Sequence, residues 1–385
     1  MKVLILSITA GEGHNSTAKA LKAELEAGGA QCEFLDTYGY INKAIRGIVA
    51  NGYLFFSSRT KRIYAKAYRR CEKRSPSGKF SPSRITNNAM ANKLCKYINE
   101  YNPDVIVCTH IFAAMLVDIL KTNGKTNAKL LSILTDFVFH PYWEEGLHAD
   151  KVVIPNDMLV LQAKKKGYTD NQIEPIGIPI RRKFENIGSR EKARESLGID
   201  RDKMTVLIMG GSMGFGKLDK VVKSLDRIPL DFQMLVVCGN NAAAKEKIEK
   251  LELEKSTKVY GFVDNIDVMM DASDCIVSKP GGLTTSEALA KRLPMIIVNP
   301  IPGQEDRNRE FLLNNGTAMA VSDTCPIDDV IFQLFSNPDR VEKMRKNIDN
   351  IRRPHASADL CDLIRKLAEE RQAELSVKSQ EVEEK

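Results

Sequence analysis

A short stretch near residue 280 has the residue types and spacing of a phosphate-binding turn. Residues 278–290 read SKPGGLTTSEALA and follow an apolar run at 275–277, so Pro280 and the two glycines mark a tight turn from strand to helix. Glycine lets a ligand approach the backbone closely, and the first amides of a helix attract phosphate because they have no partner within the helix. The stretch therefore indicates an anion site at the start of a helix.

Glu287 lies one turn into this predicted helix. Its carboxylate can accept two hydrogen bonds from a sugar diol. Phosphate at the start of the helix and ribose at the carboxylate together describe a nucleotide site. A solvent-facing glutamate on an ordinary turn explains the same residues, and the stretch alone does not separate the two interpretations.

His14 lies in the turn after the first apolar run, residues 2–8, where a predicted helix begins. Gly11 and Gly13 precede it with a Gly-x-Gly spacing similar to a dinucleotide fingerprint, and Asp36 stands where a ribose-binding acid is expected. The positive end of the helix keeps an imidazole neutral here, so that it can take a proton near neutral pH. The flanking glycines favour a catalytic base over a helix cap.

Polar residues also follow two further predicted strands. His110, Asp136 and His140 come after such runs, and the carboxyl ends of parallel strands share one edge of a sheet. We therefore expect them near His14. Asp136 is a candidate to orient His14 by accepting its second ring proton, and capping of the following turn is an equal alternative.

A second glycine-rich turn follows an apolar run at 204–209. Residues Gly211–Lys217 fit the phosphate-loop pattern G-x-x-x-x-G-K, but Leu218 stands where a magnesium-binding hydroxyl is needed. This argues against an ATPase, although the turn still suits a diphosphate. Between the two halves of the chain, the cations of residues 177–183, GIPIRRK, can clamp a phosphate.

Apolar β-type runs alternate with helical patterns through both halves of the chain. The predicted strands lie at 2–8, 32–36, 104–108, 129–134, 151–154, 204–209, 233–237, 258–260, 274–277 and 295–298. The length of 385 residues suits two domains. We predict an α/β protein with two Rossmann-like domains that face each other across a cleft. The expected segments are 1–176, 177–354, a C-terminal helix at 355–372 and a disordered tail at 373–385.

The composition is that of an ordinary soluble globular protein, with 43% hydrophobic and 28% charged residues. Its eight cysteines form no C-x-x-C pair, which predicts reduced core thiols and neither disulfides nor a zinc site. No run approaches the ~18 apolar residues of a membrane-spanning helix, and the N-terminus is too short for a signal peptide. Any membrane contact is therefore expected at the surface.

The positive charge is concentrated in residues 43–84. This segment has twelve basic residues and one acid, which gives +11 within a net charge of +7, so the rest of the chain carries −4. Basic residues interleaved with large apolar ones suit an anionic lipid surface. A solvated helical face and a nucleic-acid surface remain open alternatives on composition alone.

These motifs together resemble the two-domain (GT-B) glycosyltransferases. Within them they are most similar to the monogalactosyldiacylglycerol synthase and diacylglycerol glucosyltransferase family, and more distantly to the peptidoglycan N-acetylglucosaminyltransferase. The resemblance covers about residues 1–365. It rests on five stretches: Gly11–His14, Thr135–Asp136 with His140 and Trp143, Gly177–Arg181, Lys279–Glu287 and Pro302–Glu305.

The resemblance implies roles for individual residues. His14 matches the general base on the acceptor hydroxyl. The donor contacts would be Arg181, Gly210, Gly211 and Ser212 at the diphosphate, Phe262 and Val263 at the uracil, Gly281, Gly282 and Leu283 beneath the phosphates, Glu287 at the ribose, and Gln304 and Glu305 at the sugar. The basic segment matches a membrane-docking face, with Phe55, Phe56, Arg62, Arg69, Arg70 and Arg74 as its members.

We therefore predict an inverting transfer of a hexose from a UDP-sugar to diacylglycerol. The enzyme is expected to be peripheral on the cytoplasmic face of the cell membrane, to need no cofactor or metal ion, and to bind no nucleic acid. Two alternatives stay open: a nicotinamide-dependent oxidoreductase that uses Gly11, Gly13 and Asp36, and a protein of the same fold that binds nucleotide or lipid without turnover. The sequence does not separate glucose, galactose and N-acetylglucosamine as the transferred sugar.

Overall fold

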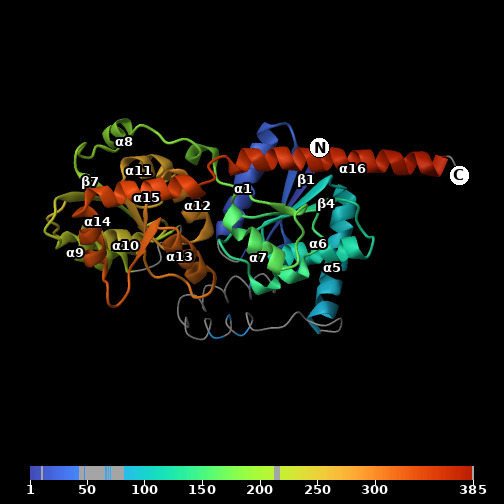
Figure 1. Ribbon diagram of the computed structural model, residues 1–385, viewed down its shortest axis with the longest axis horizontal. Helices are drawn as coiled ribbons and strands as arrows, with labels where there is room; N and C mark the ends of the chain where they lie inside the picture. The colour runs from blue at the N-terminus through green and yellow to red at the C-terminus, as the bar shows by residue number, and fades with distance from the viewer. Residues whose placement is uncertain are drawn as a thin grey trace. The chain divides into compact units, whose positions relative to one another are not determined.

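The computed structural model describes residues 1–9, 12–42, 47, 66, 68, 70, 82–211 and 217–383 (Figure 1). They form two compact units. The first contains Met1–Arg182, Pro302–Gln304 and His355–Lys385, and the second contains Lys183–Ile301 and Glu305–Pro354. The first unit thus runs past the expected division at residue 176 and also takes in the C-terminal helix.

The first unit is built on a six-stranded sheet with the strand order β2-β1-β3-β4-β5-β6. All neighbouring strands are parallel. The strands are β1 (Lys2–Ser7), β2 (Gln31–Asp36), β3 (Val105–Cys108), β4 (Lys129–Ile133), β5 (Lys151–Val153) and β6 (Ile173–Glu174). The first five confirm predicted strands, whereas β6 is too short to leave an apolar pattern in the sequence.

Helices cover this sheet (Figure 1). They are α1 (Glu12–Ala27), α2 (Thr37–Ile41), α5 (Pro82–Tyr101), α6 (Ile111–Thr122), α7 (Val160–Lys165) and α16 (Ala356–Glu383), with the 3-10 helices η1 (Pro141–Glu145) and η2 (Asp157–Leu159). Leu21 of α1 shares one buried apolar core with Val3 of β1 and with Leu360 and Ile364 of α16. The last helix of the chain therefore belongs to the fold of the first unit.

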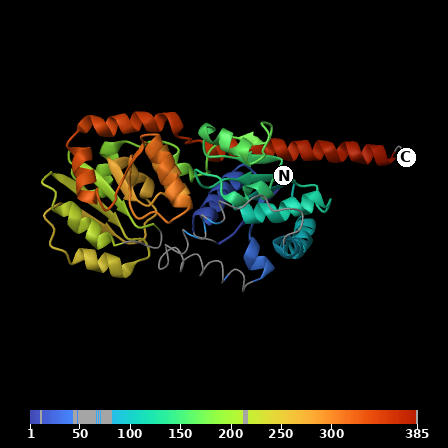
Figure 2. The same cartoon turned by 60° about the horizontal axis from the view of Figure 1, so that its bottom comes forward.

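The second unit has a parallel sheet of its own, with the strand order β12-β11-β10-β7-β8-β9 and helices on both faces (Figure 2). Its strands are β7 (Met204–Met209), β8 (Phe232–Val237), β9 (Thr257–Tyr260), β10 (Cys275–Ser278), β11 (Met295–Ile297) and β12 (Ala318–Ala320). Its helices are α8 (Arg190–Leu197), α9 (Leu218–Asp226), α10 (Ala242–Glu249), α11 (Ile266–Ala272), α12 (Gly282–Ala290), α13 (Gln304–Asn314), α14 (Ile327–Phe335) and α15 (Pro338–Ile351), and the 3-10 helix η3 (Arg182–Phe184) precedes them. The prediction of two Rossmann-like domains is confirmed.

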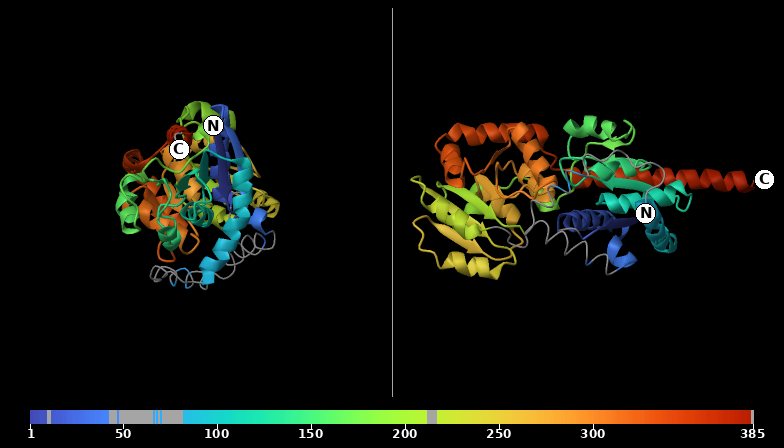
Figure 3. Two further views of the ribbon diagram at one scale, coloured as in Figure 1. Left: turned by 90° about the vertical axis from the view of Figure 1, so that its right-hand side faces the viewer. Right: turned by 90° about the horizontal axis from the view of Figure 1, so that it is seen from below.

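The C-terminal helix is longer than the sequence predicts. Instead of a helix at 355–372 and a disordered tail, α16 continues to Glu383 (Figure 3). Residues 373–383 contain no glycine or proline and are rich in good helix formers. A helix that is already held on a core extends through such residues at little cost, because nucleation is the unfavourable step.

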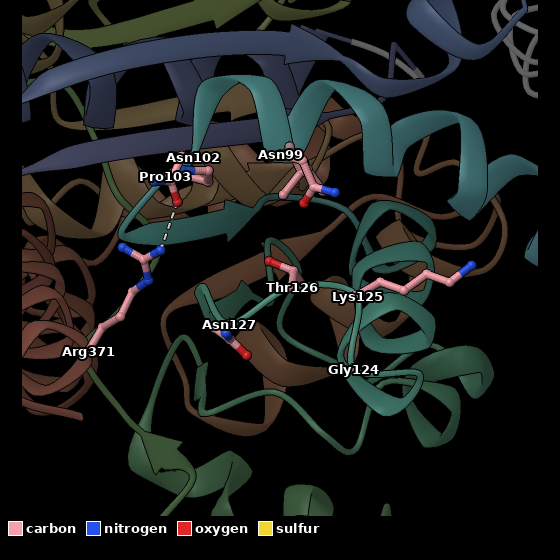
Figure 4. A pocket seen from close by; sticks show the side chains of 9 residues that line it. Asn99, Asn102, Pro103, Gly124, Lys125, Thr126, Asn127 and Arg371 are labelled. Carbon is pink, nitrogen blue, oxygen red and sulfur yellow. Dashed lines mark hydrogen bonds between the residues drawn. The ribbon is translucent and has the colours of Figure 1, made fainter. Parts of the chain in front are cut away.

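Arg371 fastens α16 to the amino edge of the first sheet. Its guanidinium donates to Oδ1 of Asp104 at 2.8 Å and to Oδ1 of Asn102 at 2.9 Å, and the residue is only 8% exposed. Figure 4 shows Arg371 and Asn102 at a polar cavity of about 180 Å³. Asp104 directly precedes β3, so this cavity lies at the edge of the sheet opposite the carboxyl ends of the strands.

Replacing Arg371 with alanine is expected to lower the free energy of unfolding by roughly 3–5 kcal/mol, because Asp104 then stays buried without its cation. Urea denaturation followed by circular dichroism measures the change. Arg365→Ala is the matched control, since Arg365 pairs with Asp362 on the exposed side of the same helix and such pairs contribute at most about 1 kcal/mol. Equal losses in the two variants would contradict the anchoring role of Arg371.

Candidate active site

Three neighbouring strands of the first sheet bring polar residues together at its carboxyl edge. The chain leaves β1 toward β2 and leaves β3 toward β4, so the switch point at which α/β sheets bind ligands lies between β1 and β3. His14 is in the first turn of α1, which follows β1. Thr109 and His110 follow β3, and Thr135 follows β4. The strand order therefore explains why residues about a hundred positions apart meet.

Two hydrogen bonds hold the imidazole of His14. Its Nδ1 lies 2.8 Å from the carbonyl oxygen of Thr109 and 2.9 Å from the hydroxyl of Thr135. A carbonyl oxygen only accepts, so Nδ1 carries the ring hydrogen and Nε2 carries the lone pair. Burial lowers the pKa of His14 below 6.5 and outweighs the Thr109 carbonyl, which raises it. His14 is thus held as a neutral base with Nε2 as the basic atom.

A second histidine packs edge-on against His14. The ring centroids of His14 and His110 are 4.6 Å apart. Nδ1 of His110 accepts a hydrogen bond from the backbone N–H of Phe112 at 3.2 Å and caps α6, so its ring hydrogen is on Nε2. Burial, with smaller contributions from His14 and His140, places the pKa of His110 well below its usual value. The two rings are therefore neutral and have opposite tautomers.

The role of Asp136 in orienting His14 stays a prediction. Asp136 follows β4 and is half-buried, and the bonds seen at Nδ1 of His14 go to the carbonyl of Thr109 and the hydroxyl of Thr135. The carbonyl reaches the ring because Thr109 extends β3, the neighbour of β1. A backbone group therefore fixes the tautomer.

Asp36, the ribose ligand of the oxidoreductase alternative, has a local structural role. Its Oδ1 accepts from the backbone N–H of Gly39 at 3.1 Å and caps α2, and its Oδ2 accepts from the hydroxyl of Thr9 at 2.6 Å. Both oxygens are thus bonded within the protein. The structure offers this alternative no support.

The second sheet has its own switch point, between β7 and β10. Two glycine turns meet there: Gly210 and Gly211 follow β7, while Gly281 and Gly282 follow β10 after two intervening residues. Gly211 has a φ of +71°, which favours glycine. Gly281 is the N-cap of α12, and no described side chain caps this helix. The first amides of α12 can therefore bind an anion.

Glu287 lies one turn after Leu283 in α12 and is only 5% exposed. The interpretation of a solvent-facing glutamate is therefore wrong. A buried carboxylate requires hydrogen-bond donors around it. Its position next to the start of the helix suits a ribose whose phosphate lies at the amides.

A hydrogen-bond network braces this turn against α13. Nζ of Lys279 donates to Oε1 of Glu305 at 2.9 Å, and the backbone N–H of Ile301 donates to Oε2 at 2.7 Å. Nδ2 of the buried Asn308, one turn further along α13, donates to the carbonyl of Pro280 at 2.9 Å. Sequence reasoning selects Glu305 and misses Lys279 and Asn308. Their only signal is the proximity of Lys279 to the turn, because their partners are 26 and 28 residues away.

Other predicted donor residues lie at the ends of strands or near the unit boundary. Phe262, in the loop after β9, is 66% exposed, and Val263 beside it is half-buried. Arg181 is exposed at the end of the first unit, and Gln304 is half-buried. Arg70 is described and exposed. The predicted residues outside the described ranges are Gly11, Phe55, Phe56, Arg62, Arg69, Arg74 and Ser212.

The described residues contain no group of three or more histidine, cysteine, aspartate or glutamate side chains placed to hold a metal ion. In the same ranges, no helix combines the length and the apolar character needed to cross a membrane. The described cysteines are free thiols, as the sequence predicts.

Models of known families match both halves of the chain. The monogalactosyldiacylglycerol synthase model matches residues 14–180, and the glycosyltransferase family 28 C-terminal domain model matches residues 205–360. The chain is therefore a glycosyltransferase, and its first half is similar to the monogalactosyldiacylglycerol synthase family. The first match takes in β2 to β6 and the second runs from within β7 to β12, so the assignment rests on both units.

Relatives of this glycosyltransferase extend over nearly its whole length. The processive diacylglycerol beta-glucosyltransferase of Bacillus subtilis (strain 168) is 29% identical over 374 residues, which cover 96% of each chain. The crystal structure of Acinetobacter baumannii MurG has a TM-score of 0.63 at 16% identity, over 95% of this chain and 99% of MurG. That of Anabaena HepE in complex with UDP has a TM-score of 0.55 at 15% identity, over 95% and 100% of the two chains. These structures confirm the GT-B fold of the glycosyltransferase.

Proposed function

We propose that this glycosyltransferase moves a hexose from a UDP-sugar to diacylglycerol at a membrane surface, with inversion at the anomeric carbon. The observation that carries the proposal is similarity over 96% of the chain to an enzyme named processive diacylglycerol beta-glucosyltransferase. A single displacement on an α-linked UDP-sugar gives the β linkage in that name. The HepE structure, which has the same fold, contains UDP and supports the choice of donor.

In the proposed step, His14 is the general base. Its Nε2 takes the proton of the acceptor hydroxyl while the hydroxyl oxygen forms a bond to the anomeric carbon. The bond from this carbon to the phosphate oxygen breaks, and its electron pair leaves with UDP. The bond from Nδ1 to the Thr109 carbonyl supports this role, because it keeps the lone pair on Nε2 and favours the imidazolium that forms.

We assign the leaving UDP to α12 and the turns around it. The first amides of α12 stabilise the charge that develops on the departing phosphate without reorganising during the reaction. The proposed contacts are Gly281, Gly282 and Leu283 beneath the phosphates, Glu287 at the ribose diol, Gly210, Gly211, Ser212 and Arg181 at the diphosphate, Phe262 and Val263 at the uracil, and Gln304 at the hexose. The reaction written this way uses no cofactor or metal ion.

We place the enzyme on the cytoplasmic face of the membrane through its basic segment, residues 43–84. Each lysine or arginine near an anionic surface contributes about 1 kcal/mol to binding. With eleven excess positive charges, the segment can hold the protein where its lipid acceptor lies.

A reconstitution assay tests the proposal. Purified protein is mixed with vesicles that contain diacylglycerol and with UDP-glucose, UDP-galactose or UDP-N-acetylglucosamine, and glycolipid and UDP are both measured. We expect both products in equal amounts with at least one donor, and neither product when diacylglycerol is left out. Absence of glycolipid with every donor would favour the non-catalytic alternative, and binding of NADH would favour the oxidoreductase.

A further inference from the structure

An ion pair stands at the switch point of the second sheet. Nζ of Lys279 lies 2.9 Å from Oε1 of Glu305, and the side chains are 29% and 8% exposed. A Cβ added to Gly211 would lie 3.9 Å from Cε of Lys279, and one added to Gly281 would lie 3.7 Å from Oε1 of Glu305. The pair therefore lies between the turn after β7 and the N-cap of α12.

The two members of the pair differ in their remaining capacity for hydrogen bonds. Glu305 uses Oε1 for Lys279 and Oε2 for the backbone N–H of Ile301. Lys279 has three ammonium hydrogens and, within the described residues, donates one of them to Glu305. A lysine held in this way can give its other hydrogens to an anion at the glycine turns.

A diphosphate at this place can use more donors than a helix start supplies. The amino end of a helix carries only about half an elementary charge. Lys279 adds charged N–H donors beside those amides. Its pair with Glu305 has no net charge, so Lys279 acts on the diphosphate through the ammonium hydrogens that Glu305 does not use. The resemblance placed Glu305 at the donor sugar, but the observed contacts direct its carboxylate to Lys279 and to the backbone.

We propose that Lys279 binds the diphosphate of the donor and that Glu305 is a positioning residue that holds the ammonium between the two glycine turns. This rests on the proposed function, since it assumes a nucleoside diphosphate at α12. It assigns a binding role to Lys279 and an indirect role to Glu305.

Equilibrium dialysis with labelled UDP and labelled uridine tests the role of Lys279. Lys279→Ala is expected to weaken the binding of UDP by roughly 10- to 100-fold and to leave uridine binding unchanged, because only UDP carries the diphosphate. The matched control is Lys203→Ala. Lys203 pairs with Asp231 at 2.8 Å with a similar exposure of 36%, but it precedes β7 at the opposite edge of the same sheet. The control should keep the wild-type ratio of the two dissociation constants.

A double-mutant cycle tests the role of Glu305. Glu305→Gln should weaken UDP binding less than Lys279→Ala does, and the double variant should bind UDP no worse than Lys279→Ala alone, because Glu305 acts through the lysine. Two results would overturn the positioning role: additive losses in the double variant, or a loss in Glu305→Gln that is confined to the KM of the UDP-sugar. Either would support Glu305 as a contact of the donor sugar.

The outcomes separate this inference from the function on which it rests. If the wild type binds UDP no better than uridine, the proposed donor fails and the inference fails with it. If the wild type prefers UDP and Lys279→Ala keeps the full preference, the donor stands and the role of Lys279 is overturned. Thermal unfolding of each variant shows whether a loss comes from instability, which would reduce UDP and uridine binding together.

Discussion

His14→Ala is expected to lower the turnover of hexose transfer by roughly 10²–10⁴-fold and to leave the dissociation constant of UDP near the wild-type value. The substitution removes Nε2, the atom proposed to take the proton of the acceptor hydroxyl. The proposed UDP contacts lie mainly on α12 and its neighbouring turns, so they do not depend on the imidazole. Initial rates at saturating donor and equilibrium dialysis of UDP measure the two quantities.

The matched control is His148→Ala. Nδ1 of His148 lies 3.1 Å from the carboxylate of Asp118, and its side chain is 64% exposed. Its loss should leave turnover within about twofold of the wild type, since surface substitutions away from a site have small effects. Wild-type turnover in His14→Ala would remove this residue from the mechanism.

The lowered pKa of His14 predicts how kcat/KM changes with pH on the acid side of the profile. Because burial lowers the pKa of His14 below 6.5, the neutral form is dominant at neutral pH, and kcat/KM should fall only as the pH decreases through that lowered pKa. Thr135→Val should move the fall to still lower pH, since the hydroxyl accepts from Nδ1–H and favours the imidazolium. This shift distinguishes His14 from His110 and from His140, whose pKa is lowered to about 4 by burial and by Lys166. A midpoint above 6.5 would contradict a neutral base whose pKa is lowered.

Most of the fold can be predicted from the sequence because its strands are buried on both faces. Such strands leave apolar runs that end at glycines or polar residues, as at Cys275–Ser278, and these runs predict the parallel strands. The short edge strands at 173–174 and 318–320 have too few residues to show a pattern. The end of α16 was missed for another reason: charge composition suggests disorder, while helix propensity and the neighbouring core decide the outcome.

In the candidate site too, the sequence predicts local features but not the contacts between residues that are distant along the chain. Local turn chemistry predicts the helix start at Gly281 and the base at His14. The partner of His14 is a carbonyl, and every residue has one, so no residue type could point to Thr109. The pairing of Lys279 with Glu305 depends on which strands are neighbours, and the sequence shows their succession but not their order in the sheet.

Glu287→Ala is expected to weaken the binding of UDP by roughly 10²-fold or more. Two hydrogen bonds from a ribose diol to one carboxylate would each contribute about 1.5–3 kcal/mol, because the acceptor is charged. Glu287 is only 5% exposed, so its carboxylate lies inside the protein. Water there cannot fully replace a hydrogen bond that is lost with a partner. Ser286→Ala is the control on the adjacent residue, because within the described ranges the Ser286 hydroxyl bonds only the Gly282 carbonyl of the same helix.

A comparison of UDP with 2′-deoxy-UDP decides what the buried carboxylate does. If Glu287 binds the diol, the wild type should prefer UDP by roughly tenfold or more, and Glu287→Ala should lose that preference because the deoxy ligand lacks the hydroxyl that the carboxylate would accept from. If the carboxylate instead serves only the packing of α12, the substitution should weaken both ligands equally and lower the unfolding temperature. If Glu287→Ala still prefers UDP, Glu287 does not bind the ribose diol. The proposal that the amides of α12 bind the phosphate would be unaffected by that result.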